Sequence, residues 1–123
     1  MENETGKKKV FENSDFKFEY EYRTFDWPVV PVMKNDEISE FVGDEDAVCE
    51  IVGDAEIILT HSGPISKKVI AAAPKLKIVG AARGGPVNIN WKACTERGIP
   101  VLYAPGRNSG AVAEYTVGMM LAQ

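Results

Sequence analysis

Cysteine, histidine and long apolar runs are all scarce in this sequence of 123 residues. Two cysteines, Cys49 and Cys94, and a single histidine, His61, are too few for a disulfide framework or a zinc site. Both cysteines stand beside small apolar residues, so we expect them to pack as small hydrophobic side chains in a reducing, cytoplasmic setting. No stretch reaches the roughly 18 apolar residues of a membrane span, and no signal-peptide pattern opens the chain.

Clustered positive charge is also lacking. Lysine and arginine number 14 against 18 acidic residues, which leaves a formal net charge of −4. The one basic block, residues 7–9, lies in a polar N-terminal stretch, where a solvated tail is the expected structure. Nucleic acid and membrane are therefore not expected as partners.

The apolar residues follow two different periods along the chain. Residues 16–23 alternate apolar and charged side chains, which predicts a strand near a sheet edge with its aromatic face buried. From Asp44 onward, short helices with polar caps alternate with short apolar strands. Strands are expected at 57–60, 76–79 and 99–103, the first of them covered on both faces. A helix from Asp44 should end at a left-handed Gly53, and the next should be capped by Ser66 and closed by Pro74. Two more helices are expected, at 91–97 with Asn90 as its cap and from 109 to 123.

This alternation predicts an α/β domain. Strands joined by helices through short turns give right-handed crossovers and a parallel sheet between helix layers. Ligand chemistry is then expected beyond the carboxyl ends of the strands, where the loops 60–64, 82–86 and 104–108 would meet.

The loop AARGGPVNIN, residues 81–90, carries the strongest chemical signal. Gly84 and Gly85 lack side chains, so their backbone amides can approach an oxyanion. Arg83 and Arg107 can add positive potential for a carboxylate, and Asn108 offers an amide donor. The alternative is that the glycines serve a tight turn while Asn108 or Ser109 caps a helix. The spacing matches neither GxGxxG nor GxxxxGK[ST], so no nucleotide phosphate cradle is expected here.

Two blocks of this region, RGGPVNIN and TERGIPVLYAPGRNSGAVAEYTVGMMLA, resemble the D-isomer-specific 2-hydroxyacid dehydrogenase family. The resemblance covers roughly residues 51–123, and it implies a flavodoxin-like substrate domain that leads through a hinge into a Rossmann domain binding NAD. It places residues 1–104 in the substrate-binding domain, and 105–123 in the hinge and the first helix of a truncated NAD-binding domain. The N-terminal part is short of one strand–helix unit.

The same resemblance implies roles for individual residues. Gly84 and Gly85 match the loop whose amides bind the substrate carboxylate, and Asn108 matches an asparagine that contacts substrate in some members. Ser62 and Gly63 are weaker candidates from the neighbouring loop, and Arg83 joins the predicted substrate-binding set. The loop departs from the family pattern at Arg83 and Pro86, and the latter has no amide to donate.

The resemblance places the catalytic and cofactor-binding groups outside this chain. The family's GxGxxG, its catalytic arginine and its glutamate–histidine pair all fall after Gln123, so no catalytic, NAD-binding or metal-binding residue is assigned here. Whether the cofactor is NAD or NADP stays open. His61 does not match the catalytic histidine and is expected to be structural or to line the cleft, and Glu114 is expected to be a structural acid.

Three functions are compatible with these observations. The first is the substrate-binding part of an NAD-dependent oxidoreductase acting on CH–OH groups of small 2-hydroxy or 2-oxo acids, inactive by itself. The second is a stand-alone flavodoxin-like module that binds a small anion or dimerises through its C-terminal helix, where apolar residues recur at helical spacing. The third is a remnant that binds nothing. A homodimer through the C-terminal helix is expected.

Overall fold

The computed structural model describes residues 15–26 and 32–123. Its centre is a three-stranded parallel sheet in the order β3-β4-β5, formed by β3 (Ile57–Thr60), β4 (Ile78–Ala81) and β5 (Val101–Tyr103). The register pairs Ile57 with Ile78, and Val79 with Val101. The α/β class and the parallel sheet predicted from the alternating pattern are confirmed.

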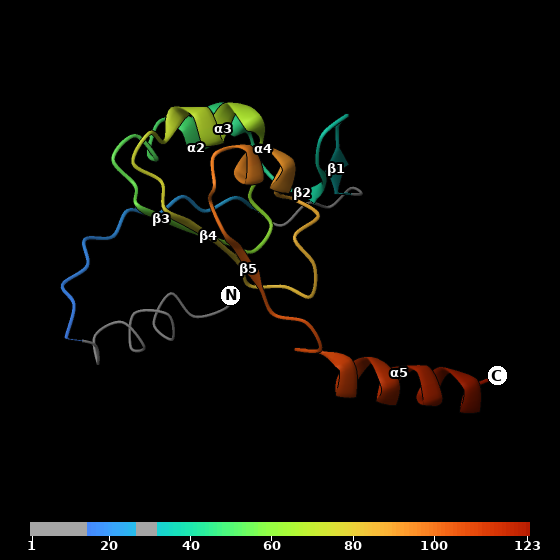
Figure 1. Cartoon of the computed structure of the whole chain (residues 1–123). Helices are drawn as coiled ribbons and strands as arrows, with labels where there is room; N and C mark the ends of the chain where they lie inside the picture. The colour runs from blue at the N-terminus through green and yellow to red at the C-terminus, as the bar shows by residue number, and fades with distance from the viewer. Residues whose placement is uncertain (1–14, 27–31) are drawn as a thin grey trace.

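Three short helices, α2 (Glu45–Cys49), α3 (Lys67–Ala72) and α4 (Trp91–Glu96), lie on one face of this sheet (Figure 1). The strands follow one another in sequence order, so right-handed crossovers carry both connecting helices to the same side. The core forms between these helices and the sheet. Its most deeply buried side chains include Val69, Ile70, Val79, Ile89 and Cys94.

Local capping signals account for where α3 and α4 begin. The Ser66 hydroxyl accepts from the amide of Val69, and the Asn90 side chain accepts from the amide of Ala93 at 3.0 Å. Gly98, just after α4, has φ of +67°, the left-handed conformation that suits glycine. The start of α2 after Asp44 is also confirmed, although the Asp44 side chain makes no capping bond.

Several sequence predictions were wrong. Gly53 is not left-handed, because α2 already ends at Cys49 with Glu50 as its C-cap. Strand 57–60 is not covered on both faces, since Ile57 and Leu59 are 43% and 50% exposed. Residues 16–23 form no strand: their aromatic rings follow one another about 6.2–6.4 Å apart, but the segment pairs with no described strand and is mostly exposed.

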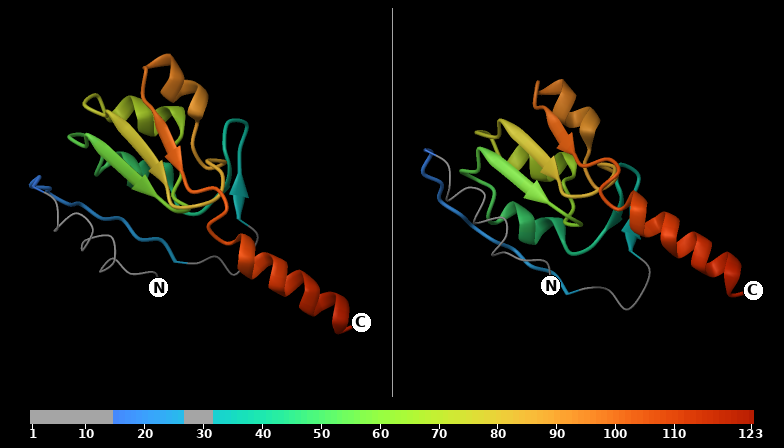
Figure 2. Two further views of the ribbon diagram at one scale, coloured as in Figure 1. Left: turned by 60° about the horizontal axis from the view of Figure 1, so that its bottom comes forward. Right: turned by 90° about the horizontal axis from the view of Figure 1, so that it is seen from below.

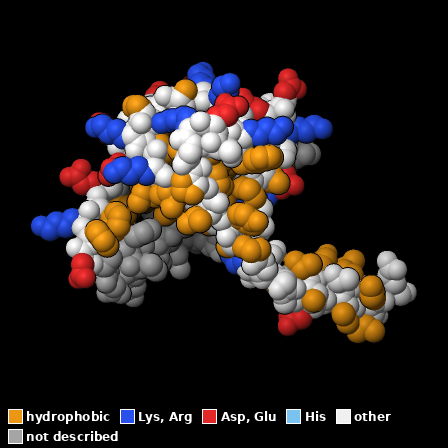
Figure 3. All heavy atoms as spheres, in the orientation of Figure 1, with side chains coloured by type: hydrophobic (Ala, Val, Ile, Leu, Met, Phe, Trp, Pro, Cys, Tyr) orange, Lys and Arg blue, Asp and Glu red, His pale blue; other side chains and the backbone are white. Residues whose placement is uncertain are grey.

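Two peripheral parts complete the structure. A small antiparallel pair of strands, β1 (Met33–Lys34) and β2 (Ser39–Phe41), lies beside the carboxyl ends of the parallel strands. The final helix, α5 (Ser109–Leu121), extends away from the sheet in every view (Figure 2) and buries none of its side chains. Apolar side chains therefore gather on its surface (Figure 3). The domain boundary at 104–105 stays a prediction.

Candidate ligand cleft at the carboxyl ends of the strands

The loops that follow the three parallel strands are joined to one another by backbone hydrogen bonds. The amide of Ala82 donates to the carbonyl oxygen of Thr60 at 2.8 Å, and the amide of Ala104 donates to that of Arg83 at 2.9 Å. These bonds extend the pairing of the sheet past the strand ends. The glycine loop is therefore held between its two neighbours.

The strand β2 is tied to the same loops from outside. The amide of Ser39 donates to the carbonyl oxygen of Val87, and the amide of Val42 donates to that of Ser62, both at 2.9 Å. Glu40 lies between these two anchors and has φ of +51°, an uncommon conformation for a residue with a side chain. Such outliers persist only where the surroundings hold them, and they occur often at ligand sites.

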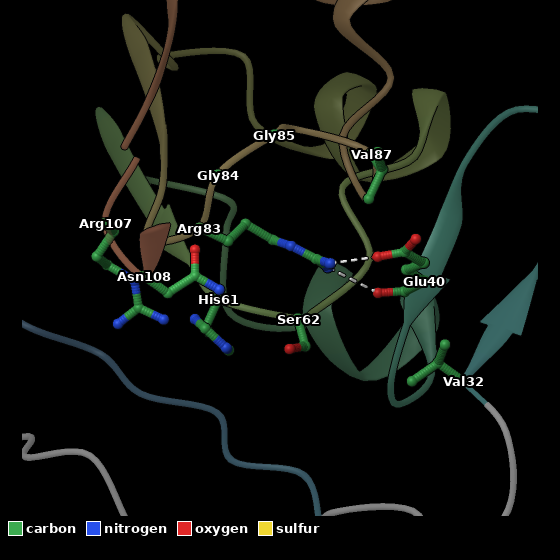
Figure 4. Close-up of a pocket in the computed structure, with 10 residues that line it drawn as sticks. All are labelled: Val32, Glu40, His61, Ser62, Arg83, Gly84, Gly85, Val87, Arg107 and Asn108. Carbon is green, nitrogen blue, oxygen red and sulfur yellow. Dashed lines mark hydrogen bonds and ion pairs between the residues drawn. The ribbon is translucent and has the colours of Figure 1, made fainter. Parts of the chain in front are cut away.

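Between these elements lies an open cleft of about 500 Å³. It is drawn in Figure 4. Its lining residues are Val32, Glu40, His61, Ser62, Arg83, Gly84, Gly85, Val87, Arg107 and Asn108. Five of the six residues predicted to bind substrate are thus brought together. The sixth, Gly63, is not part of the lining, and its carbonyl oxygen accepts from the Thr60 hydroxyl at 3.1 Å and from the Asn88 amide at 2.8 Å.

The two glycines of the cleft keep their amides available. Within residues 15–26 and 32–123, neither Gly84 nor Gly85 donates its N–H to another group. Neither has a left-handed φ, and a Cβ added to either would meet no atom within 4 Å. A tight turn therefore does not require glycine here. What glycine provides at both positions is open space beside the backbone.

Asn108 precedes α5 but does not cap it with its side chain. The turn before the helix is instead closed by Ser109, whose amide and hydroxyl both donate to the carbonyl oxygen of Gly106, at 3.1 and 2.9 Å. Gly106 has φ of +76°. The Asn108 carboxamide consequently faces the cleft (Figure 4).

Arg83 is already engaged inside the protein. Its guanidinium donates to the carbonyl oxygen of Glu40 at 3.0 Å and forms an ion pair with the Glu40 carboxylate. Figure 4 shows the side chain extending toward β2. The Arg83 side chain is only 22% exposed. Sequence reasoning missed Glu40, since nothing local connects residue 40 to residue 83.

Two further residues complete the neighbourhood of the cleft. The Nδ1 atom of His61 lies 3.0 Å from the carbonyl oxygen of Ala82, and the ring lines the cleft. Asn88 is fully buried, and its amide bond to Gly63 ties the glycine loop to the loop after β3. Its Oδ1 atom has no partner among the described residues. No local pattern in the sequence indicates this role for Asn88.

The cleft does not fit a dinucleotide such as NAD. In a dinucleotide cradle a helix begins directly at the glycines and points its N-terminus at the pyrophosphate. Here α4 begins at Trp91, six residues after Gly85, and is six residues long. The acidic residue in the cleft, Glu40, is paired with Arg83 instead of being available to a ribose.

The described residues also bear on other kinds of site. Residues 15–26 and 32–123 contain no group of three or more side chains suited to hold a metal ion. In that part of the chain, no helix is both long enough and apolar enough to cross a membrane.

Fold and site together define an α/β domain with a small ligand cleft at the carboxyl ends of its parallel strands. The family model for "D-isomer specific 2-hydroxyacid dehydrogenase, catalytic domain" matches residues 22–120. The chain therefore belongs to this family, whose members are typically NAD-dependent oxidoreductases acting on CH–OH groups. The resemblance noted in the sequence is confirmed.

Individual relatives cover shorter stretches. The chain is 42% identical over 65 residues to the putative 2-hydroxyacid dehydrogenase YoaD of Bacillus subtilis, which covers 53% of this chain and 19% of that protein. It is 42% identical over 79 residues to the D-3-phosphoglycerate dehydrogenase of Methanocaldococcus jannaschii, covering 63% and 15%. The PH0520 protein of Pyrococcus horikoshii has a similar structure, with a TM-score of 0.53 and 32% identity over 61% of this chain and 23% of that one. The chain thus spans less than a quarter of the length of each.

Proposed function

We propose that this chain is the substrate-binding part of an NAD-dependent D-2-hydroxyacid dehydrogenase, in which hydride passes between the nicotinamide and a small 2-hydroxy or 2-oxo acid. The chain's contribution is to orient the substrate carboxylate. NAD itself binds elsewhere in the whole enzyme, because the cleft offers no dinucleotide cradle. The chain alone is therefore expected to oxidise no NADH in the presence of glyoxylate.

The observation that carries this proposal is the pair of unused amides at Gly84 and Gly85. Backbone N–H groups that lack internal partners are suited to an oxyanion, and the absence of side chains at both residues leaves room for one to approach. Asn108 adds a side-chain donor from the facing loop, and Ser62 adds a hydroxyl. The loops are fixed by backbone bonds, so the donors are arranged before the ligand arrives.

The test is a glycine-to-alanine series. G84A and G85A each add a methyl group at a residue that lines the cleft, and the backbone conformation accepts alanine. We expect each variant to be more stable than the parent chain by about 0.4–1 kcal/mol, because alanine restricts the unfolded chain, yet to bind glycolate at least tenfold more weakly. Binding is followed through the amide shifts of residues 84 and 85 in a nitrogen-15 NMR titration.

The matched control is G53A. A Cβ at Gly53 likewise meets nothing within 4 Å and the residue is not left-handed, but Gly53 lies outside the cleft. This variant should gain similar stability and bind glycolate unchanged. If glycolate shifts no amide of the cleft in the parent chain, or binds G85A as tightly, the carboxylate role is disproved.

A second candidate function is assembly through α5. This helix buries no side chain, and Tyr115, Met120 and Leu121 are 70%, 70% and 83% exposed. If a homodimer buries this apolar surface, the apparent molecular mass in analytical ultracentrifugation should rise with protein concentration. M120E should then restore the monomer. A monomer at all concentrations leaves the carboxylate proposal standing and removes this one.

A further inference from the structure

The charged side chains of the cleft do not match a highly charged substrate. Among the described residues, the charged side chains that line it are those of Arg83, Arg107 and Glu40, so their formal charges sum to +1 with histidine counted as neutral. A small carboxylic acid carries one negative charge. A phosphorylated acid carries about 2.5 to 3, since the phosphate monoester adds 1.5 to 2.

Glu40 is the residue that lowers this charge, and its backbone is held in place on both sides. The hydrogen bonds of Ser39 to Val87 and of Val42 to Ser62 hold the backbone on both sides of it. Glu40 has a left-handed φ of +51°, and both its carbonyl oxygen and its carboxylate contact Arg83. The carboxylate therefore neutralises the arginine that directly precedes the two glycines in the chain.

We propose that Glu40 is a specificity-determining residue that restricts the cleft to small acids with a single negative charge and excludes phosphorylated ones. The proposal rests on the proposed function, because it concerns the same carboxylate site. It separates this chain from the relatives that are D-3-phosphoglycerate dehydrogenases by name. The physical basis is like-charge repulsion between Glu40 and a phosphate, together with the loss of Arg83 as a free charge-assisted donor.

The experiment compares two probes, D-glycerate and D-3-phosphoglycerate, on the full 123-residue chain and on E40Q. The substitution raises the formal charge of the cleft from +1 to +2 and leaves the contact between Arg83 and the backbone carbonyl of residue 40 in place. We expect the parent chain to prefer D-glycerate. In E40Q the ratio of the two dissociation constants should move toward the phosphorylated acid by about tenfold or more, the effect of a charge-assisted hydrogen bond.

Two further variants make the result specific. E96Q removes the same charge from the end of α4, at a residue that does not line the cleft, and should change the ratio less than twofold. E40N also removes the charge and suits a left-handed backbone, so it replaces E40Q if glutamine disturbs folding. Both Glu40 variants should shift the ratio in the same direction.

The outcomes separate the two proposals. D-glycerate binding with an unchanged ratio in E40Q and E40N overturns the role of Glu40 and leaves the carboxylate site intact. A parent chain that prefers the phosphorylated acid overturns it as well. Binding of neither probe by any form overturns both proposals together.

Discussion

The two faces of the parallel sheet contain similar residues and have different surroundings. In β3, Ile58 faces the helices and is 8% exposed, while its neighbour Ile57 faces away from them and is 43% exposed. Leu102 of β5, which lies in register with the half-exposed Leu59 through Gly80, is exposed as well, at 58%. Both faces are apolar because the strands are continuously apolar. Among the described residues, helices cover only one of the two faces, because sequential strand order places α3 and α4 on the same side.

This difference shows that the apolar sequence of a strand does not by itself determine whether other elements pack on both of its faces. A continuous apolar run is typical of strands buried on both faces, and β3 has that sequence. Residues 15–26 and 32–123 contain no helix that packs on the second face of the sheet. The covered face holds the core of the domain, and the loops of the cleft are built on that core.

The largest expected effect comes from comparing the two isoleucines of β3. I58A should lower the free energy of unfolding by about 2–5 kcal/mol, because it opens a cavity in the core. I57A should cost about 1 kcal/mol or less, because nearly half of that side chain already contacts water. Urea unfolding of both variants measures the difference. Equal losses would contradict the open face.

A smaller effect is expected at the two helix starts. N90A should lower the free energy of unfolding by about 1–2 kcal/mol, since Asn90 caps α4 and also donates to Glu37. N108A should leave it nearly unchanged, because the Asn108 side chain makes no capping bond. Thermal unfolding of the pair provides the measurement. A comparable loss in N108A would indicate that α5 is capped in solution.

The smallest effect concerns the two thiols. Burial raises the pKa of Cys94 and of Cys49 above their ordinary value of 9.0, chiefly because a buried thiolate loses its contact with water. Cys94 is fully buried in the core and Cys49 only partly, so iodoacetamide should alkylate Cys49 much faster. Mass spectrometry of peptides after timed alkylation distinguishes them. Equal rates would mean that α4 opens readily.

The same pKa shifts predict a pH dependence. A thiol whose pKa is raised by folding stabilises the folded state fully below the pKa of the unfolded chain, and this stabilisation is lost as the pH rises through the folded pKa. The free energy of unfolding should therefore fall as the pH is raised above about 9. C94A should show a weaker fall than the parent chain. If the free energy of unfolding of C94A falls with pH as steeply as that of the parent chain, groups other than Cys94 cause the fall.

Much of the fold was predictable from local signals. Ser66 and Asn90 each precede a helix and bond to an amide three residues later, and Gly98 adopts the left-handed turn that ends α4. The predicted strand at 16–23 failed because period-two alternation requires a partner strand, which local sequence cannot provide. Gly53 failed as a helix stop because the helix ended earlier.

The candidate site was predictable to a similar degree. Gly84, Gly85, Arg83, Ser62 and Asn108 line one cleft because the carboxyl ends of parallel strands share one edge of a sheet. Whether they bind a carboxylate stays a prediction. Asn88 was missed because its importance lies in burial, and Glu40 because its partner lies 43 residues further along the chain.

The amino-acid sequence alone determined the alternation of strands and helices, their caps, and the loops at one edge of the sheet, because each depends on residues a few positions apart. The tertiary structure decided which face of the sheet is covered, that Asn88 is buried, and that Glu40 neutralises Arg83. Those features depend on contacts between distant segments, whose free energies are set by three-dimensional packing and not by local pattern.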